Sequence, residues 1–82
     1  MQKEDDKYIP IECGLHSEYE LAIMHNAKCE VSWTDLDGAI KTATGEPTDL
    51  FTQNKSEYLK VIFESNITVN IRLDKIIKLN VI

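Results

Sequence analysis

The side chains in this sequence that could do chemistry gather in one segment near the N-terminus, residues 11–26. Two histidines and two cysteines in and beside this segment have a spacing that superficially resembles a zinc site. They are Cys13, His16, His25 and Cys29. A helix through the segment would separate the two histidines by ~13 Å along one rod. One zinc ion, with its ligands only ~2 Å away, cannot bridge that distance, so we expect no metal site.

Catalysis is not expected from the same segment either. Cys13 lies near His16 in the sequence and could imitate a nucleophile and its base, but no motif supplies a third, orienting group. The three glycines are isolated, so they do not form a loop that would cradle a phosphate. We expect a protein that is not an enzyme and needs no cofactor, with Cys13 and Cys29 as small core residues.

The residues around this segment predict a short helix. Ser17 and Glu20 fit the capping box S-x-x-E, in which each side chain bonds the backbone amide of the other residue. We therefore expect the helix to run from Glu18 to about Asn26, with Gly14 breaking the chain before it. Glu18 and Glu20 would then lie in the first turn, where the helix dipole favours acids and where both could also face a partner.

After Cys29 the hydrophobic periodicity changes to that of strands. Five strands are expected, over residues 29–33, 39–43, 58–63, 67–73 and 76–82. Asp37-Gly38 is typical of a hairpin turn. We expect a loop at Thr44–Thr48, because Pro47 is unsuited to a central strand. A second loop is expected at Thr52–Ser56. The fold class predicted is mainly β, with one N-terminal α-helix followed by about five antiparallel strands that curl into a small open barrel.

Length and charge narrow the possible partners. The 82 residues predict one domain over residues 8–82, preceded by a flexible acidic tail at residues 1–7. The net charge of −5 disfavours a polyanion and favours a basic partner. The longest apolar run is Leu21–Met24 and the first residues are polar, so we expect a cytoplasmic protein without a membrane span or signal peptide.

A small basic cluster near the C-terminus keeps one alternative open. Arg72, Lys75 and Lys78 could bind RNA on a small β-barrel. The acidic remainder of the chain opposes this interpretation. Arg72 also has a simpler expected role, as the ion-pair partner of Asp74 that fixes the last turn.

Several short motifs, in their order and spacing, resemble the Rho-binding antiterminator family, Rof. They are Tyr8-x-Pro10-Ile11-x-Cys13, Glu20-Leu21-Ala22, Asp37-Gly38, Thr48-Asp49-Leu50, Glu57-Tyr58-Leu59 and Ile71-Arg72-Leu73-Asp74-Lys75-Ile76. The resemblance implies an Sm-like fold, with an N-terminal helix and a strongly bent antiparallel sheet. It also implies a non-catalytic inhibitor that binds the RNA-binding region of the hexameric termination factor Rho, blocks RNA loading and so causes antitermination.

The resemblance also implies where the contact with Rho lies. The main contact would be the start of the helix, over His16, Ser17, Glu18, Tyr19 and Glu20, with a supporting loop at Gln53, Asn54 and Lys55. The family typically has Tyr-Asp where this chain has His16-Ser17, and its glutamate is matched by Glu20. Glu18 and Tyr19 would supply the acid and the aromatic ring from shifted positions. We expect no direct nucleic-acid binding, and a monomer when Rho is absent.

Overall fold

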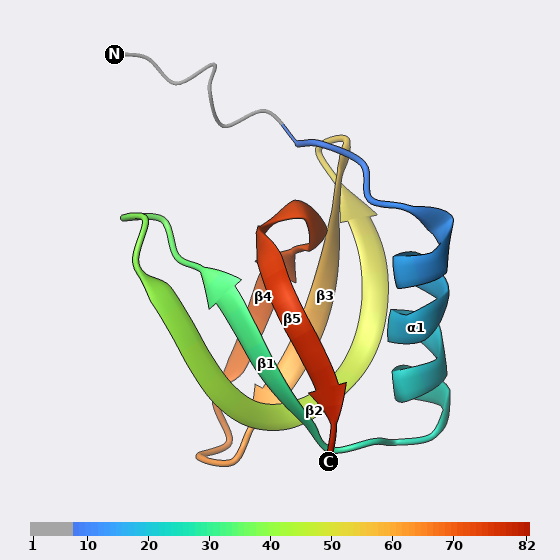
Figure 1. Cartoon of the computed structure of the whole chain (residues 1–82), viewed down its shortest axis with the longest axis vertical. Helices are drawn as coiled ribbons and strands as arrows, with labels where there is room; N and C mark the ends of the chain where they lie inside the picture. Colours follow the sequence, from blue (N-terminus) through green and yellow to red (C-terminus); the bar gives the residue numbers. More distant parts are fainter. Residues whose placement is uncertain (1–7) are drawn as a thin grey trace.

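The computed structural model describes residues 8–82, and the tail predicted at residues 1–7 lies outside the described part. In chain order the elements are α1 (Cys13–Met24), β1 (Cys29–Thr34), β2 (Ile40–Gln53), β3 (Ser56–Phe63), β4 (Thr68–Arg72), the 3-10 turn η2 (Leu73–Lys75) and β5 (Ile76–Val81). The strands form one sheet in the order β4-β3-β2-β1-β5, with every neighbouring pair antiparallel. The predicted fold class is confirmed: one helix is followed by five bent antiparallel strands in an open, unclosed sheet (Figure 1).

The helix starts earlier than the capping box predicts. Its N-cap is Glu12, whose side chain makes no capping hydrogen bond, and the amide of His16 donates to the Glu12 carbonyl at 3.1 Å. Ser17 and Glu20 therefore both lie inside α1, and the predicted capping box is wrong. Gly14 does not break the chain but belongs to the first turn of the helix. The backbone of Glu12 is extended, so the helix can begin directly after it.

The loop predicted at Thr44–Thr48 is also wrong, because β2 runs through it without interruption. Two residues make this path possible. Gly45 lies against β3 so closely that a Cβ atom there would be 2.7 Å from the carbonyl oxygen of Ile62. Pro47 is buried at a register shift between β2 and β3, and such a bulge is where a sheet tolerates a residue without an N–H. Strand β2 bends strongly as it passes this point (Figure 1).

Backbone geometry explains the turns between β1 and β2 and between β2 and β3. Gly38, with φ of 85°, lies in the turn between β1 and β2, as the Asp-Gly pair predicts. Between β2 and β3 the predicted loop shortens to two residues, Asn54 and Lys55, with φ values of 52° and 66°. Two consecutive positive φ values are typical of the type I′ turn, which matches the twist of paired strands.

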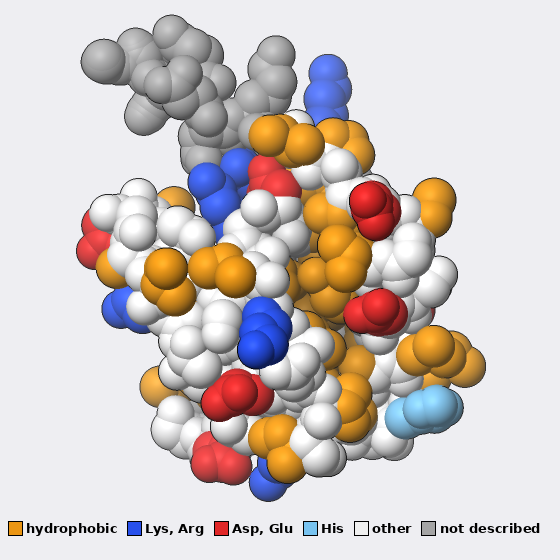
Figure 2. All heavy atoms as spheres, viewed as in Figure 1, with side chains coloured by type: hydrophobic (Ala, Val, Ile, Leu, Met, Phe, Trp, Pro, Cys, Tyr) orange, Lys and Arg blue, Asp and Glu red, His pale blue; other side chains and the backbone are white. Residues whose placement is uncertain are grey.

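The core lies where α1 packs against the sheet, chiefly on β2. Its buried residues are Tyr19, Ala22, Cys29, Val31, Leu59, Val61, Phe63, Ile71 and Leu73. The prediction for Cys29 is confirmed and that for Cys13 is wrong, since Cys13 is exposed on α1. Figure 2 shows hydrophobic side chains between α1 and β5, where the helix leaves part of the sheet uncovered. Within residues 8–82 no helix is long and apolar enough to cross a membrane.

Candidate protein-binding site

The middle of α1 presents most of the predicted helix contact residues to solvent. Ser17, Glu18 and Glu20 are exposed, and the Glu20 side chain is 56% exposed. His16 is half-buried on the side of the helix that faces the sheet. Acidic side chains are visible along α1 in Figure 2. The helix therefore offers carboxylates where the resemblance places the main contact.

Tyr19 does not lie with these residues, although the sequence interpretation groups it with them. Its side chain is only 4% exposed and belongs to the hydrophobic core. Burial raises the pKa of the Tyr19 hydroxyl above its usual value, and the negative charge of Glu18 adds to the effect. Tyr19 therefore anchors α1 to the sheet, and its ring is not available at the surface as a substitute for a missing aromatic contact.

The second predicted region is the tip of the β2–β3 hairpin. Gln53 ends β2, and Asn54 and Lys55 form the turn, with all three side chains exposed. In Figure 1 this tip lies at the same end of the molecule as the start of α1, although about forty residues separate the two in the sequence. The fold thus brings the two regions predicted from the sequence toward the same end of the molecule.

His16 joins the helix to this hairpin. Its Nδ1 atom lies 3.6 Å from Glu20 Oε2, and its Nε2 atom lies 3.7 Å from Oε2 of Glu57 on β3. Glu57 pairs across the ladder with Thr52, the neighbour of Gln53. A shallow pocket of about 170 Å³ is lined by His16, Glu20, Thr52 and Glu57, together with Leu50 and Phe51. We call the resulting surface the acidic face and define it as His16, Ser17, Glu18, Glu20, Gln53, Asn54, Lys55 and Glu57.

Glu57 is held in place by a residue that sequence reasoning missed as part of the site. The hydroxyl of Tyr8 donates a hydrogen bond of 2.8 Å to Glu57 Oε1. Burial raises the pKa of Tyr8 to about 12, and the hydrogen bond to Glu57 and its charge act in the same direction. The Arg72 guanidinium lies 5.9 Å from the centre of the Tyr8 ring. The only sequence signal for this contact is that Tyr8 and Glu57 each begin a motif of the family resemblance.

The basic residues near the C-terminus are arranged differently from the predicted cluster. The Nε and Nη2 atoms of Arg72 donate to the two carboxylate oxygens of Asp74 at 2.7 and 3.1 Å, which confirms the predicted ion pair. The amide of Ile9 donates to the same Asp74 carboxylate at 2.9 Å, so the pair also fixes the segment before α1. Arg72 and Lys75 line a second pocket, whereas Lys78 is exposed on β5.

Between Tyr8 and Ile82 no group of three or more His, Cys, Asp or Glu side chains is arranged to hold a metal ion. What the acidic face provides chemically is two exposed carboxylates on a rigid helix, a third carboxylate on β3, and hydrogen-bonding groups at the hairpin tip. Such a surface is electrostatically complementary to positively charged groups.

Comparisons with known proteins bear on the fold only. No family model matches the sequence, and no curated protein is significantly similar to it. Among solved structures the chain is similar to proteasome accessory factor B/C (PafBC) of Arthrobacter aurescens, with a TM-score of 0.77 and 15% sequence identity. The match covers 93% of this chain but spans only 12% of the length of PafBC. At this identity the likeness establishes a shared small β fold and carries no functional assignment.

Proposed function

We propose that this chain is a non-catalytic, cytoplasmic inhibitor of the transcription termination factor Rho. In this role it binds the RNA-binding region of Rho through the acidic face and blocks RNA loading, which causes antitermination. The proposal rests on the motif resemblance to the Rof family. It is supported by one observation above all: His16 contacts both Glu20 on α1 and Glu57 on β3, which places the predicted helix region beside the strand that follows the predicted hairpin tip.

The physical basis of the proposal is competition between carboxylates and phosphates. A surface that loads RNA must attract phosphate groups, so it also attracts a rigid arrangement of acids. Glu18 and Glu20 are exposed in the middle of α1, and the net charge of −5 reinforces their field. Association of this kind is steered by charge, and it weakens as salt screens the interaction.

The burial of Tyr19 removes this residue from the proposed contact with Rho. Because Tyr19 packs in the core, it cannot replace the aromatic residue that the family typically carries at the position of His16. Ser17 likewise has no charge to replace the family aspartate. We therefore assign the main acidic contacts to Glu18 and Glu20, with the hairpin tip at Gln53–Lys55 as a hydrogen-bonding rim that carries one positive charge, on Lys55.

The proposal is tested by binding to purified Rho at low salt, measured by pull-down and by titration. Glu20→Lys should weaken binding strongly, because it reverses a charge at the centre of the acidic face. Glu46→Lys is the matched control, since Glu46 is exposed near Lys28 at the end of the molecule where α1 finishes. Equal losses for the two variants would contradict the acidic face as the contact. Thermal melts of both variants show whether any loss comes only from unfolding.

The alternative, an Sm-like RNA-binding module that uses Arg72, Lys75 and Lys78, predicts a different result. Filter binding with single-stranded RNA separates the two functions, because the proposed inhibitor should retain little RNA on its own. Strong, salt-sensitive RNA binding that is lost when the three cations are replaced would favour the alternative.

A further inference from the structure

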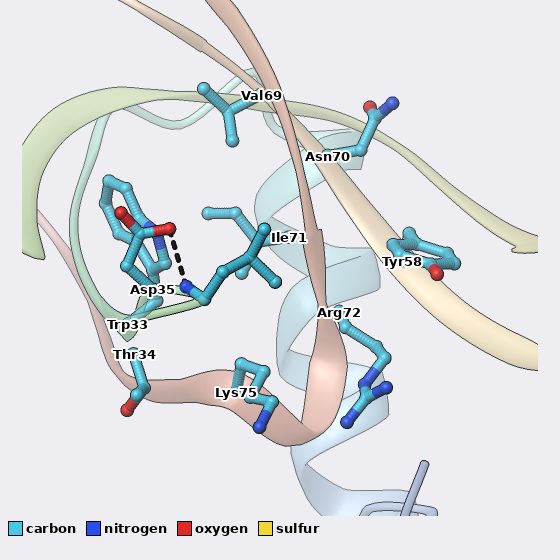
Figure 3. A pocket seen from close by; sticks show the side chains of 10 residues that line it. Trp33, Thr34, Asp35, Tyr58, Val69, Asn70, Ile71, Arg72 and Lys75 are labelled. Carbon is cyan, nitrogen blue, oxygen red and sulfur yellow. Dashed lines mark hydrogen bonds between the residues drawn. The ribbon is translucent and has the colours of Figure 1, made fainter. Parts of the chain in front are cut away.

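A second pocket lies outside the acidic face. It lies where edge strand β4 faces the end of β1, and it has a volume of about 350 Å³ (Figure 3). Its lining comes from β1 and the turn after it, from β3 and β4, and from η2. Because the sheet is open, with β4 at its edge, this space is not filled by a neighbouring strand. It shares no residue with the acidic face.

The walls of this pocket combine aromatic and apolar surface. Trp33 lines it from β1, and Val69 and Ile71 line it from β4. The Trp33 ring is already held by stacking on Phe63, with ring centres 5.4 Å apart and planes inclined by 20°. Tyr58, which lies on the other side of β4 from Trp33 in Figure 3, is held in the same way by Phe51, also at 5.4 Å. These rings are therefore fixed before any ligand arrives, which lowers the entropic cost of binding a flat molecule.

The charge that could attract an anion at this pocket comes from Lys75. In Figure 3 Lys75 lies on the same side of β4 as Trp33 and Ile71, whereas Arg72 lies on the other side. The carboxylate of Asp35 also lines the pocket, but its Oδ1 accepts the Leu36 amide at 2.8 Å and its Oδ2 lies 3.6 Å from Nζ of Lys41. The negative charge on this wall is thus matched by a lysine that does not line the pocket. Asp74 similarly fixes the guanidinium of Arg72.

We infer that this pocket binds a small planar aromatic anion, with the ring against Trp33 and the negative group toward Lys75. The volume lies at the small end of the range for ligand pockets, ~300–1,000 Å³, which suits one ring system with one charged substituent. A nucleoside monophosphate and an aromatic carboxylate both have this chemistry. The inference goes beyond the proposed inhibition of Rho, and it stands or fails independently because the two surfaces do not overlap.

The chain contains one tryptophan, so ligand binding has an unambiguous reporter. In a two-dimensional ¹H–¹⁵N NMR spectrum Trp33 gives a single indole N–H peak. We expect AMP or 4-hydroxybenzoate to shift this peak saturably, and the two titrations distinguish a phosphate from a carboxylate ligand. Adenosine, which lacks the charge, should shift it much less, and ribose 5-phosphate, which lacks the aromatic ring, should not shift it.

Two variants test the residues named. Lys75→Gln should weaken binding about threefold to fivefold, the range expected for one partly exposed charge. Lys78→Gln is the control, because Lys78 is exposed on β5 and does not line the pocket, so affinity should not change. Val69→Phe should fill the space and abolish the shift; if that variant fails to fold, the comparison of the two lysines decides. An unmoved indole peak at millimolar ligand, equal shifts with AMP and adenosine, or equal affinities for both lysine variants would overturn the inference.

Discussion

Replacing Gly45 by alanine tests the claim that the bend of β2 depends on close contact with β3. The added Cβ would lie 2.7 Å from the Ile62 carbonyl oxygen, 2.7 Å from Phe63 Cδ1 and 2.9 Å from Val61 Cγ1. Favourable contacts between such atoms lie at ~3.5–4.0 Å, so all three are too short. The nearest atom belongs to the backbone of β3, which is held by ladders to β2 and β4 and cannot rotate away. We expect a loss of ~1–3 kcal/mol, as for other overpacked sites.

Gly14→Ala is the matched control, because it makes the same chemical change in open space. Nothing lies within 4 Å of a Cβ at Gly14, which is in the first turn of α1. Alanine there should stabilise the helix by up to ~1 kcal/mol. For a domain of this size 1 kcal/mol corresponds to ~4–8 °C in melting temperature. The melting temperature and the urea midpoint should therefore fall for Gly45→Ala and rise for Gly14→Ala. A Gly45→Ala protein that melts as high as the parent would refute the steric argument.

Three further predictions follow from burial and pairing. A thiol reagent should label the exposed Cys13 quickly and Cys29 only on unfolding. Cys29 is 0% exposed, and burial raises the pKa of its thiol. Equal labelling rates for the two cysteines would contradict the packing of β1. The raised pKa of Tyr8 favours the neutral phenol in the folded protein, so its contribution to stability is present below pH ~10 and is lost as the pH rises toward ~12. Urea denaturation measured between pH ~10 and ~12 should show that the stability of Tyr8→Phe falls less with rising pH than the stability of the parent. Asp74→Asn should cost ~1–3 kcal/mol in urea melts, because it removes the carboxylate charge that pairs with the partly buried Arg72 guanidinium. A loss below ~0.5 kcal/mol would mean that the pair contributes little.

Local sequence patterns predicted the strands well and the helix start badly. Strict alternation identified β1 and β4, because period two is a direct consequence of one buried face. The S-x-x-E pattern at Ser17 misplaced the helix start because those residues are equally compatible with the interior of a helix. The actual start at Cys13 has no side-chain cap to signal it.

The path of β2 illustrates what local patterns cannot supply. Gly and Pro within five residues are typical of a loop, yet Gly45 and Pro47 lie in a central strand. Their roles depend on contacts with β3, a segment at least nine residues further along the chain, and on a bulge that only the pairing register reveals. A sequence pattern records residue types, but it does not record which strand will lie against them.

The candidate site was also predicted only in part from the sequence. The resemblance placed contact residues at the helix start and at the hairpin tip, and the structure adds the contact between His16 and Glu57, which connects α1 to β3. The hydrogen bond from Tyr8 to Glu57 spans 49 residues and has no local pattern. Helical periodicity does predict the burial of Tyr19, because Tyr19 shares the inward face of α1 with Ala22, three residues later.

The most direct test of the central claim is competition between this protein and RNA for purified Rho. A labelled single-stranded RNA is bound to Rho, and the protein is titrated in at low and at high salt. The account predicts displacement of the RNA that weakens with salt, is lost with the double variant Glu18→Lys/Glu20→Lys, and is unchanged with Glu46→Lys. Absence of both binding and displacement at low salt, with the protein shown to be folded, would contradict the proposed function.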